Sequence, residues 1–352
     1  MTGSLPGRSP VDDAILALLL EVAGTPKPGN VDRARDLEDL RFESFLGGAV
    51  GARSGLERAA RDGSVGVAFE RAVAGMADRA GTNTQFGCLL LLVPLLKATA
   101  AGNDPAADDR LASSDPATSG DCSRTGVKGD CSRTGVKGDC SRTGVDRVTR
   151  ATTVDDAVAF YTAFEHVDVA VDDPPADAVD LDVRRGSEAE STLRDRGLTL
   201  RDVMALGADG RVEDDGKRNA DVDRIPDRNA QEWIEGFPRT FRAADWILND
   251  EGPVTDRAAR AFILLLASEP DTLVATDHDP GVAHEVSRRA ASLIDGAPVA
   301  PASGSLADRI DLDAAESLAA EFVADGINPG TTADLTCAAL YVALRHGVEV
   351  RP

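Results

Sequence analysis

The chain has 352 residues and carries 60 acidic against 38 basic side chains, which gives a formal charge of −22. Such a negative field repels the phosphates of nucleic acids and the headgroups of anionic membranes, so both are excluded as expected partners. Much aspartate and very little lysine is typical of proteins from a very salty cytoplasm, where salt screens the self-repulsion. We therefore expect a cytoplasmic, halophilic protein.

Apolar residues recur at helical spacing along almost the whole chain, and no series of alternating strands is found. The sequence therefore predicts an all-α protein with one helical catalytic domain, made of residues 1–101 and 147–352. Its longest apolar run, Cys88 to Leu96, is about half of what a membrane span needs. After a first helix near the N-terminus, the predicted helices cover residues 42–61, 66–80, 84–100, 154–167, 188–206, 230–249, 255–268, 280–294, 306–325 and 332–346.

Two segments interrupt the helical pattern. Residues 102–146 contain a nine-residue repeat, GDCSRTGVK twice and then GDCSRTGVD, and lack the apolar content to fold, which predicts a disordered insert. Binding of a metal by its evenly spaced Asp and Cys residues is the alternative. Residues 207–229 form an acidic stretch without the Gly and terminal Glu of a calcium loop, so a solvated acidic loop is expected.

The first motif, EVAGTPKPGNVDR, holds a lysine between two prolines where a helix ends. Pro26 and Pro28 keep Lys27 in an extended segment, and Gly29 permits a sharp turn after it. A stiffly held lysine loses little entropy when it binds a phosphate. The alternative is a Pro-Gly helix terminator with a solvated lysine.

The second motif, AGTNTQFG, precedes a strongly apolar run. Thr82 or Thr84 can cap the helix that follows, which leaves free backbone N–H groups beside Asn83. Helix starts of this kind receive phosphates. Plain capping of a buried helix is the alternative.

The third motif, GINPGTTADL, turns at Pro329 and Gly330. Thr331 and Asp334 have the spacing of a capping box, which needs no further function. A role of Asp334 as a metal ligand or base, at the start of a helix, is equally open.

The fourth motif, PDTLVATDHDPG, packs Asp277, His278 and Asp279 together before Pro280. A histidine between carboxylates is easier to protonate and can donate to a phosphate or substrate. A surface turn is the alternative, because Asp-Pro and Pro-Gly steps favour turns.

In this order, KPGNVD, GTNTQFG, PDTLVATDHD and NPGTTADL resemble the triphosphoribosyl-dephospho-CoA synthase family, all-helical enzymes that make the precursor of a prosthetic group. The resemblance runs from about Leu16 to Leu344. Two departures stand out. Gln85 and Phe86 replace the His and Lys of the family's G-x-N-T-H-K-G, and its R-K-H-G survives only as His278.

The resemblance implies that the 2′-hydroxyl of dephospho-CoA attacks C1′ of the ATP ribose and that adenine leaves. It further implies a triphosphate held by Mg²⁺, cations and helix starts, and a carboxylate that acts as the base. Residues of the four motifs are assigned to these tasks: Lys27, Gly29, Asn30, Gly81, Thr82, Asn83, Thr84, Asn328 and Gly330 to ATP binding, Asp32 and Asp334 to metal binding or base catalysis, and His278 to catalysis by orienting the nucleotide.

Three alternatives remain open at this point. A related ATP-using enzyme could act on another acceptor, a non-catalytic relative could only bind nucleotide, and a helical scaffold could use the Gly and Pro corners merely to end its helices. Release of free adenine and stabilisation by Mg-ATP are the observations that separate them.

Overall fold

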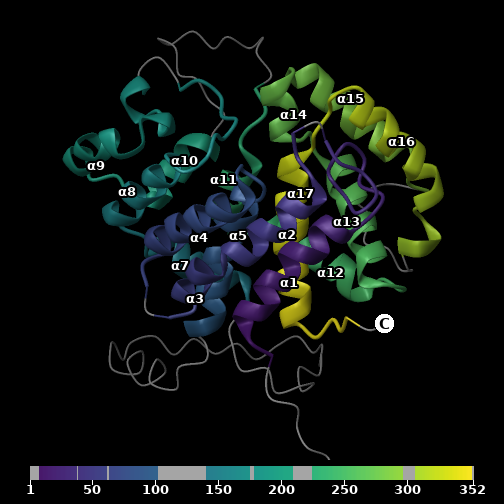
Figure 1. Ribbon diagram of the computed structural model, residues 1–352, viewed down its shortest axis with the longest axis horizontal. Coiled ribbons are helices and arrows are strands. Elements are labelled where there is room, and N and C mark those ends of the chain that lie inside the picture. The colour runs from purple at the N-terminus through teal and green to yellow at the C-terminus, as the bar shows by residue number, and fades with distance from the viewer. Residues whose placement is uncertain are drawn as a thin grey trace, which may run out of the picture.

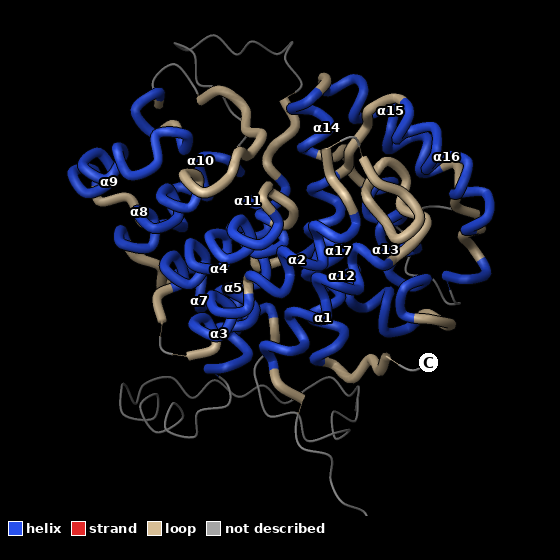
Figure 2. The backbone as a smooth tube through the Cα atoms, in the orientation of Figure 1, coloured by secondary structure: helices blue, strands red, loops and turns tan. Residues whose placement is uncertain are grey.

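The computed structural model describes residues 8–37, 39–61, 63–101, 140–174, 178–208, 224–295 and 306–350. Within these ranges the regular elements are helices, and β-type pairing is limited to two isolated bridges, Asp32 with Arg35 and Ile294 with Ile310 (Figure 2). The all-α prediction is confirmed. None of the described helices is both long and apolar enough to cross a membrane.

The described part of the chain forms its helices in the following order. The first half of the chain forms α1 (Pro10–Ala23), α2 (Phe42–Gly51), α3 (Arg53–Ala59), α4 (Val65–Ala80), α5 (Phe86–Ala101), α7 (Arg142–Arg150), α8 (Val154–Ala163), the 3₁₀ turns η1 (Val179–Leu181) and η2 (Val183–Ala189), and α9 (Glu190–Arg196). The second half forms α10 (Leu200–Ala208), α11 (Arg228–Glu235), α12 (Pro238–Asn249), α13 (Val254–Ser268), α14 (Thr272–Asp277), α15 (Pro280–Ala291), η3 (Leu306–Asp308), α16 (Leu312–Ala324) and α17 (Gly330–Arg345).

Two helices, α5 and α17, form the centre of the molecule. Every residue from Cys88 to Leu96 is buried in α5, and every residue from Leu335 to Arg345 is buried in α17. A helix that is apolar on all sides must be covered on all sides. Helix α17 accordingly packs against α1, α5, α12 and α13.

The remaining helices lie on two sides of this centre (Figure 1). Helices α8, α9 and α10 lie on one side, and α14, α15 and α16 lie on the other, with α11 between them near one end of α17. Two hydrophobic clusters match this division. The larger contains α5 and most of α17, and the second joins α13 to α15 and α16. Each side is therefore packed on its own cluster, and α17 contributes residues to both.

Several predicted boundaries are wrong. The span 42–61 is two helices rather than one, because the chain bends at Ala52 between α2 and α3. The span 230–249 breaks at Gly236 and Phe237, which adopt left-handed backbone angles before Pro238 starts α12. Glycine commonly ends a helix, and proline is commonly found in the first turn of the next one.

The last part of the predicted insert, residues 140–146, belongs to the described part of the chain. Most of the insert, residues 102–139, lies outside the described residues, but Cys140 and Val145 of its last part are buried in the larger cluster. Ser141 caps α7 by accepting a hydrogen bond from the Gly144 amide at 3.1 Å. Of the predicted acidic loop, residues 209–223 lie outside the described ranges, while its two ends continue α10 and begin α11.

Candidate active site

A cavity of about 910 Å³ lies between the two sides of the molecule. Its wall takes residues from α8 and α10, from the start of α5 and α11, and from α14 and α17. All four sequence motifs reach it. Their lining residues include Asn30 and Val31, Thr82, Asn83, Thr84 and Gly87, Thr276 and Asp277, and Asn328, Gly330 and Asp334.

The first and third motifs meet at Gly29. Its backbone has φ +82, and a Cβ there would come within 2.6 Å of the Ile327 oxygen and 2.9 Å of Pro329 Cδ. Only glycine fits such a backbone in such a space. The close approach brings Asn30 to Asn328, whose Oδ1 accepts a hydrogen bond from Asn30 Nδ2 at 2.9 Å.

Lys27 lies behind this wall rather than in it. Its side chain is 1% exposed, its Nζ donates to Glu21 and to Asn30 Oδ1 at 2.8 Å, and it lies 5.8 Å from the centre of the Phe262 ring. Glu21 and Asn30 line the cavity, whereas Lys27 is absent from its lining. In this arrangement Lys27 is separated from the cavity by Glu21 and Asn30, and its ammonium is paired with a buried carboxylate.

The chain Lys27–Asn30–Asn328 fixes which way the amides point. An ammonium has only donors, so the oxygen of Asn30 must face Lys27 and its nitrogen must face Asn328. The oxygen of Asn328 is then occupied by Asn30. Asn328 can therefore offer a ligand its NH₂ group, which is a hydrogen-bond donor.

Asp32 is also buried behind the wall and is 0% exposed. Its Oδ2 accepts from Thr25 Oγ1 at 2.7 Å, from the Lys27 amide at 3.1 Å and from Arg35 Nη1 at 2.8 Å, and its Oδ1 accepts from the Ala34 amide at 2.8 Å. A carboxylate with four protein donors holds the loop together. The position of Asp32 therefore favours a structural role over the predicted one as a metal ligand or base.

The second motif forms the start of α5. Asn83, rather than the predicted Thr82 or Thr84, binds the helix end, and its Oδ1 accepts from the Phe86 amide at 3.1 Å. Thr84 lines the cavity, but its hydroxyl is buried next to Gly48 and makes no hydrogen bond to the described part of the protein. Gly81 ends α4 with φ +75 and does not line the cavity.

The two departures from the family motif have distinct surroundings. Gln85 is buried and donates through Nε2 to the Leu18 oxygen at 3.1 Å, so it ties α5 to α1. Phe86 lines the cavity and contacts Phe69 and Phe164, with ring centres 5.0 and 4.9 Å away. The cavity lining is therefore apolar and aromatic at Phe86, the position at which the family motif has a lysine.

Asp334 is the central carboxylate of the site. It lines the cavity from the first turns of α17, its Oδ2 accepts from Asn229 Nδ2 at 2.8 Å, and its Oδ1 accepts from Cys88 Sγ at 3.2 Å. Burial raises the pKa of the Asp334 carboxyl to about 7, although the hydrogen bonds from Asn229 and Cys88 act to lower it. The predicted capping box is wrong, because α17 begins at Gly330 without a side-chain cap.

Gly87 makes room for this arrangement. A Cβ at this position would lie 1.9 Å from Asp334 Oδ2 and 2.7 Å from Asn229 Nδ2. The last glycine of the second motif therefore allows the carboxylate of the third motif to lie directly against α5.

The fourth motif contributes less than expected. Asp277 and Thr276 line the cavity, but His278 is exposed, and its Nε2 lies 3.2 Å from the Gly326 oxygen. His278 ends α14 outside the cavity, so its predicted catalytic role is not supported by its position. Asp271, the residue that caps α14, is buried and accepts from the amide and hydroxyl of Thr332, each at 2.7 Å.

The charge of the described lining is strongly negative. One guanidinium, Arg224, faces nine carboxylates: Glu21, Asp39, Asp168, Asp172, Asp173, Asp182, Asp227, Asp277 and Asp334. Among the described residues, no three His, Cys, Asp or Glu side chains gather closely enough to form a metal site of their own. A metal bound here would depend on ligands that a substrate brings.

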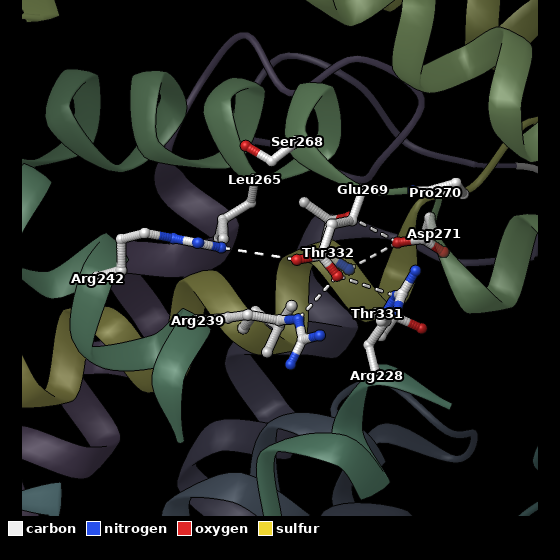
Figure 3. A pocket seen from close by; sticks show the side chains of 11 residues that line it. Arg228, Arg239, Arg242, Leu265, Ser268, Glu269, Pro270, Asp271, Thr331 and Thr332 are labelled. Atoms are coloured by element: carbon white, nitrogen blue, oxygen red, sulfur yellow. Dashed lines mark hydrogen bonds and ion pairs between the residues drawn. The ribbon is translucent and has the colours of Figure 1, made fainter. Parts of the chain in front are cut away.

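A second, much smaller pocket lies beside the start of α17 (Figure 3). Arg228, Arg239 and Arg242 point toward Glu269 there, and the volume is about 10 Å³. That is room for about one water molecule. The arginines are engaged with carboxylates, and this cluster joins α11, α12 and α13 beneath the large cavity.

Comparisons with known proteins agree with this geometry. A family model for ATP:dephospho-CoA triphosphoribosyl transferase matches residues 8–350. No curated protein matches. Among solved structures, one described as a "putative triphosphoribosyl-dephospho-coA synthase" from Archaeoglobus fulgidus is similar, with a TM-score of 0.56 and 19% identity over 86% of this chain and 99% of that chain. At this identity the likeness shows the shared fold.

Proposed function

This chain belongs to the ATP:dephospho-CoA triphosphoribosyl transferase family, and we propose that it carries out the family's reaction in the large cavity. One observation carries the proposal. Four motifs that are far apart in the sequence all contribute residues to the wall of a single cavity. Its volume of about 910 Å³ lies at the upper end of ordinary small-molecule sites, as two large substrates require.

In this proposal Asp334 is the base. It takes the proton of the 2′-hydroxyl of dephospho-CoA while the oxygen forms a bond to C1′ of the ATP ribose. The bond from C1′ to the adenine nitrogen breaks with its electron pair going to adenine, and the proton taken up by Asp334 is passed on to adenine, so that neutral adenine leaves and the carboxylate is restored. A carboxyl whose pKa is about 7 suits this task, because a base works best when its pKa lies near the working pH.

The triphosphate is placed between the starts of α5 and α17. Thr82, Asn83 and Thr84 line the cavity at the first of these, and Gly330 lies at the second. Helix starts carry free N–H groups and a partial positive charge, which favour phosphate oxygens. The NH₂ group of Asn328, held in place by Lys27 and Asn30, supplies a further donor.

Mg²⁺ would supply the positive charge that the cavity wall lacks. Magnesium is commonly held by substrate phosphates together with one or two carboxylates, and the lining offers several carboxylates besides Asp334. Asp32 does not fit this task, since its oxygens already have four protein donors.

The negative surface charge supports two further parts of the proposal. We place the enzyme in the cytoplasm, where ATP and dephospho-CoA are available, and we propose that it works at high salt. With a formal charge of −22, screening of self-repulsion should raise its thermal midpoint as KCl is added.

The test is the release of free adenine. The protein incubated with Mg-ATP and dephospho-CoA should produce adenine and a triphosphoribosylated acceptor in equal amounts, and omission of either substrate should abolish both. A product that contains adenosine phosphate instead would assign a different reaction to the cavity.

A further inference from the structure

Asn229, in the first turn of α11, was not predicted as a site residue. It is 8% exposed and lines the cavity beside Asp334. Its Nδ2 donates to Asp334 Oδ2 at 2.8 Å, while its Oδ1 is buried and makes no hydrogen bond within the described part of the chain. A buried amide oxygen without a partner is costly, and it commonly marks a place where a ligand supplies the donor.

The orientation of the Asn229 amide is fixed. An ionised carboxylate only accepts hydrogen bonds, so a flipped amide would set two acceptors, Asn229 Oδ1 and Asp334 Oδ2, against each other. The backbone is held as well, because the Asn229 amide donates to Asp227 Oδ1 at 2.9 Å. Gly87 packs against the same Nδ2. Asn229 therefore holds an unpaired acceptor next to the carboxylate.

We propose that Asn229 Oδ1 accepts a hydrogen bond from the 3′-hydroxyl of the acceptor's ribose and so selects an acceptor that has a free 2′,3′-diol. This inference rests on the proposed function, in which Asp334 binds the 2′-hydroxyl. Two neighbouring acceptors, a carboxylate and an amide oxygen, match the two neighbouring hydroxyl donors of a ribose.

The same arrangement explains why the acceptor must lack its 3′-phosphate. A 3′-phosphate offers only acceptors and negative charge in its ionised form, and it would face the Asn229 oxygen and the Asp334 carboxylate. CoA is therefore disfavoured both because its 3′-phosphate has no hydrogen to donate and because its negative charge is repelled. A site that binds a hydroxyl through a buried polar group also rejects an analogue without that hydroxyl, because the group is then left unpaired.

The ATP ribose also carries a 2′,3′-diol, and the experiment separates the two sources. The measurement is kcat/KM for adenine release by the wild-type protein, with dephospho-CoA compared with its 3′-deoxy analogue, and ATP compared with 3′-deoxy-ATP. We expect the 3′-deoxy acceptor to be poorer by about 10- to 100-fold. Equal efficiency with the two acceptors, or discrimination only against 3′-deoxy-ATP, would overturn the assignment.

Asn229→Ala should bring the preference for the 3′-hydroxyl to within about 3-fold of unity, because the acceptor is gone from the site. Asn249→Ala is the matched control, since Asn249 lies exposed on α12 outside the cavity and should leave the preference unchanged. The wild-type comparison is decisive even if Asn229→Ala does not fold. Absence of adenine release with every substrate pair would instead contradict the proposed function as a whole.

Discussion

Asp32 and Asp334 are aspartates of two motifs that the sequence places in the same role, yet their surroundings differ in every respect that matters. Asp32 is fully buried, lies outside the cavity lining and receives four hydrogen bonds from the chain, one of them from Arg35. Asp334 faces the cavity and receives one N–H and one S–H donor. The surroundings of Asp32 stabilise its negative charge, whereas those of Asp334 leave a carboxylate that is able to exchange a proton.

The comparison teaches that carboxylates of different motifs can have different tasks although the sequence gives them the same one. Asp32 holds the loop of the first motif, in which Gly29 and Asn30 meet the third motif, whereas Asp334 lines the cavity and is the carboxylate that we propose as the base. Five tests address this division, in order of expected effect.

Asp334→Asn should lower kcat for adenine release by about 10²- to 10⁴-fold, because the amide cannot accept the proton of the attacking hydroxyl. The variant should fold, since the amide replaces a carboxylate that burial already disfavours. Asp195→Asn, on exposed α9, is the control and should retain wild-type activity. Activity of Asp334→Asn within 10-fold of wild type would remove Asp334 from the role of base.

Asp32→Asn should act on stability. The change removes the charge that pairs with Arg35 and sets an NH₂ group against protein donors, so the free energy of unfolding should fall by about 3 kcal/mol. Urea unfolding measures it, with activity normalised to the folded fraction. A variant as stable as wild type but inactive would return Asp32 to the chemistry.

The pH dependence of stability should differ between wild type and Asp334→Asn. The raised pKa of Asp334 means that the folded state holds a proton that the unfolded state has lost between about pH 4 and pH 7. Wild type should therefore lose about 2–3 kcal/mol relative to Asp334→Asn between about pH 5 and pH 8. Parallel stability curves for the two proteins would show that burial does not raise this pKa.

The same carboxyl predicts a kinetic profile. Because the base must be ionised, log kcat/KM should rise with pH up to about 7 and level off above it. A profile that is flat from about pH 5 to pH 8 would mean that another group takes the proton.

Gly87→Ala should have the smallest effect on stability, about 1–2 kcal/mol, because the added methyl group displaces the Asp334 carboxylate from α5. Activity should fall with it, since Asn229 and Asp334 are moved apart from their present contact. Gly197→Ala is a useful comparison on strain alone, because Gly197 has φ +65 and no atom within 4 Å of an added Cβ.

The agreement between sequence and structure is best where a local rule suffices. The apolar periodicity of α5 and α17 predicted two helices that are buried on all sides. The order of the four motifs indicated the family, and residues of all four reach one cavity. Helix boundaries at Ala52 and Gly236 were missed, because a short break does not disturb the overall periodicity.

Individual roles were harder to predict. From the sequence, Lys27 was expected to be free to bind a phosphate. Its partner Glu21 lies six residues earlier, in the first helix, and the local sequence pattern does not indicate that the two side chains pair. Asn229 was overlooked at the end of an acidic stretch, and no motif identified it. Its function follows only from its place beside Asp334, which is 105 residues away in the chain.

The sequence by itself determined the helical class, the acidic surface, the four motifs and their order, because periodicity, charge and turn chemistry are local properties of the chain. Only the tertiary structure decided which polar groups face the cavity and which are neutralised behind its wall. That choice depends on contacts between distant segments, such as Gly87 against Asp334 and Asn30 against Asn328. Burial and hydrogen-bond partners set the chemistry of each carboxylate, and both arise only when those segments meet.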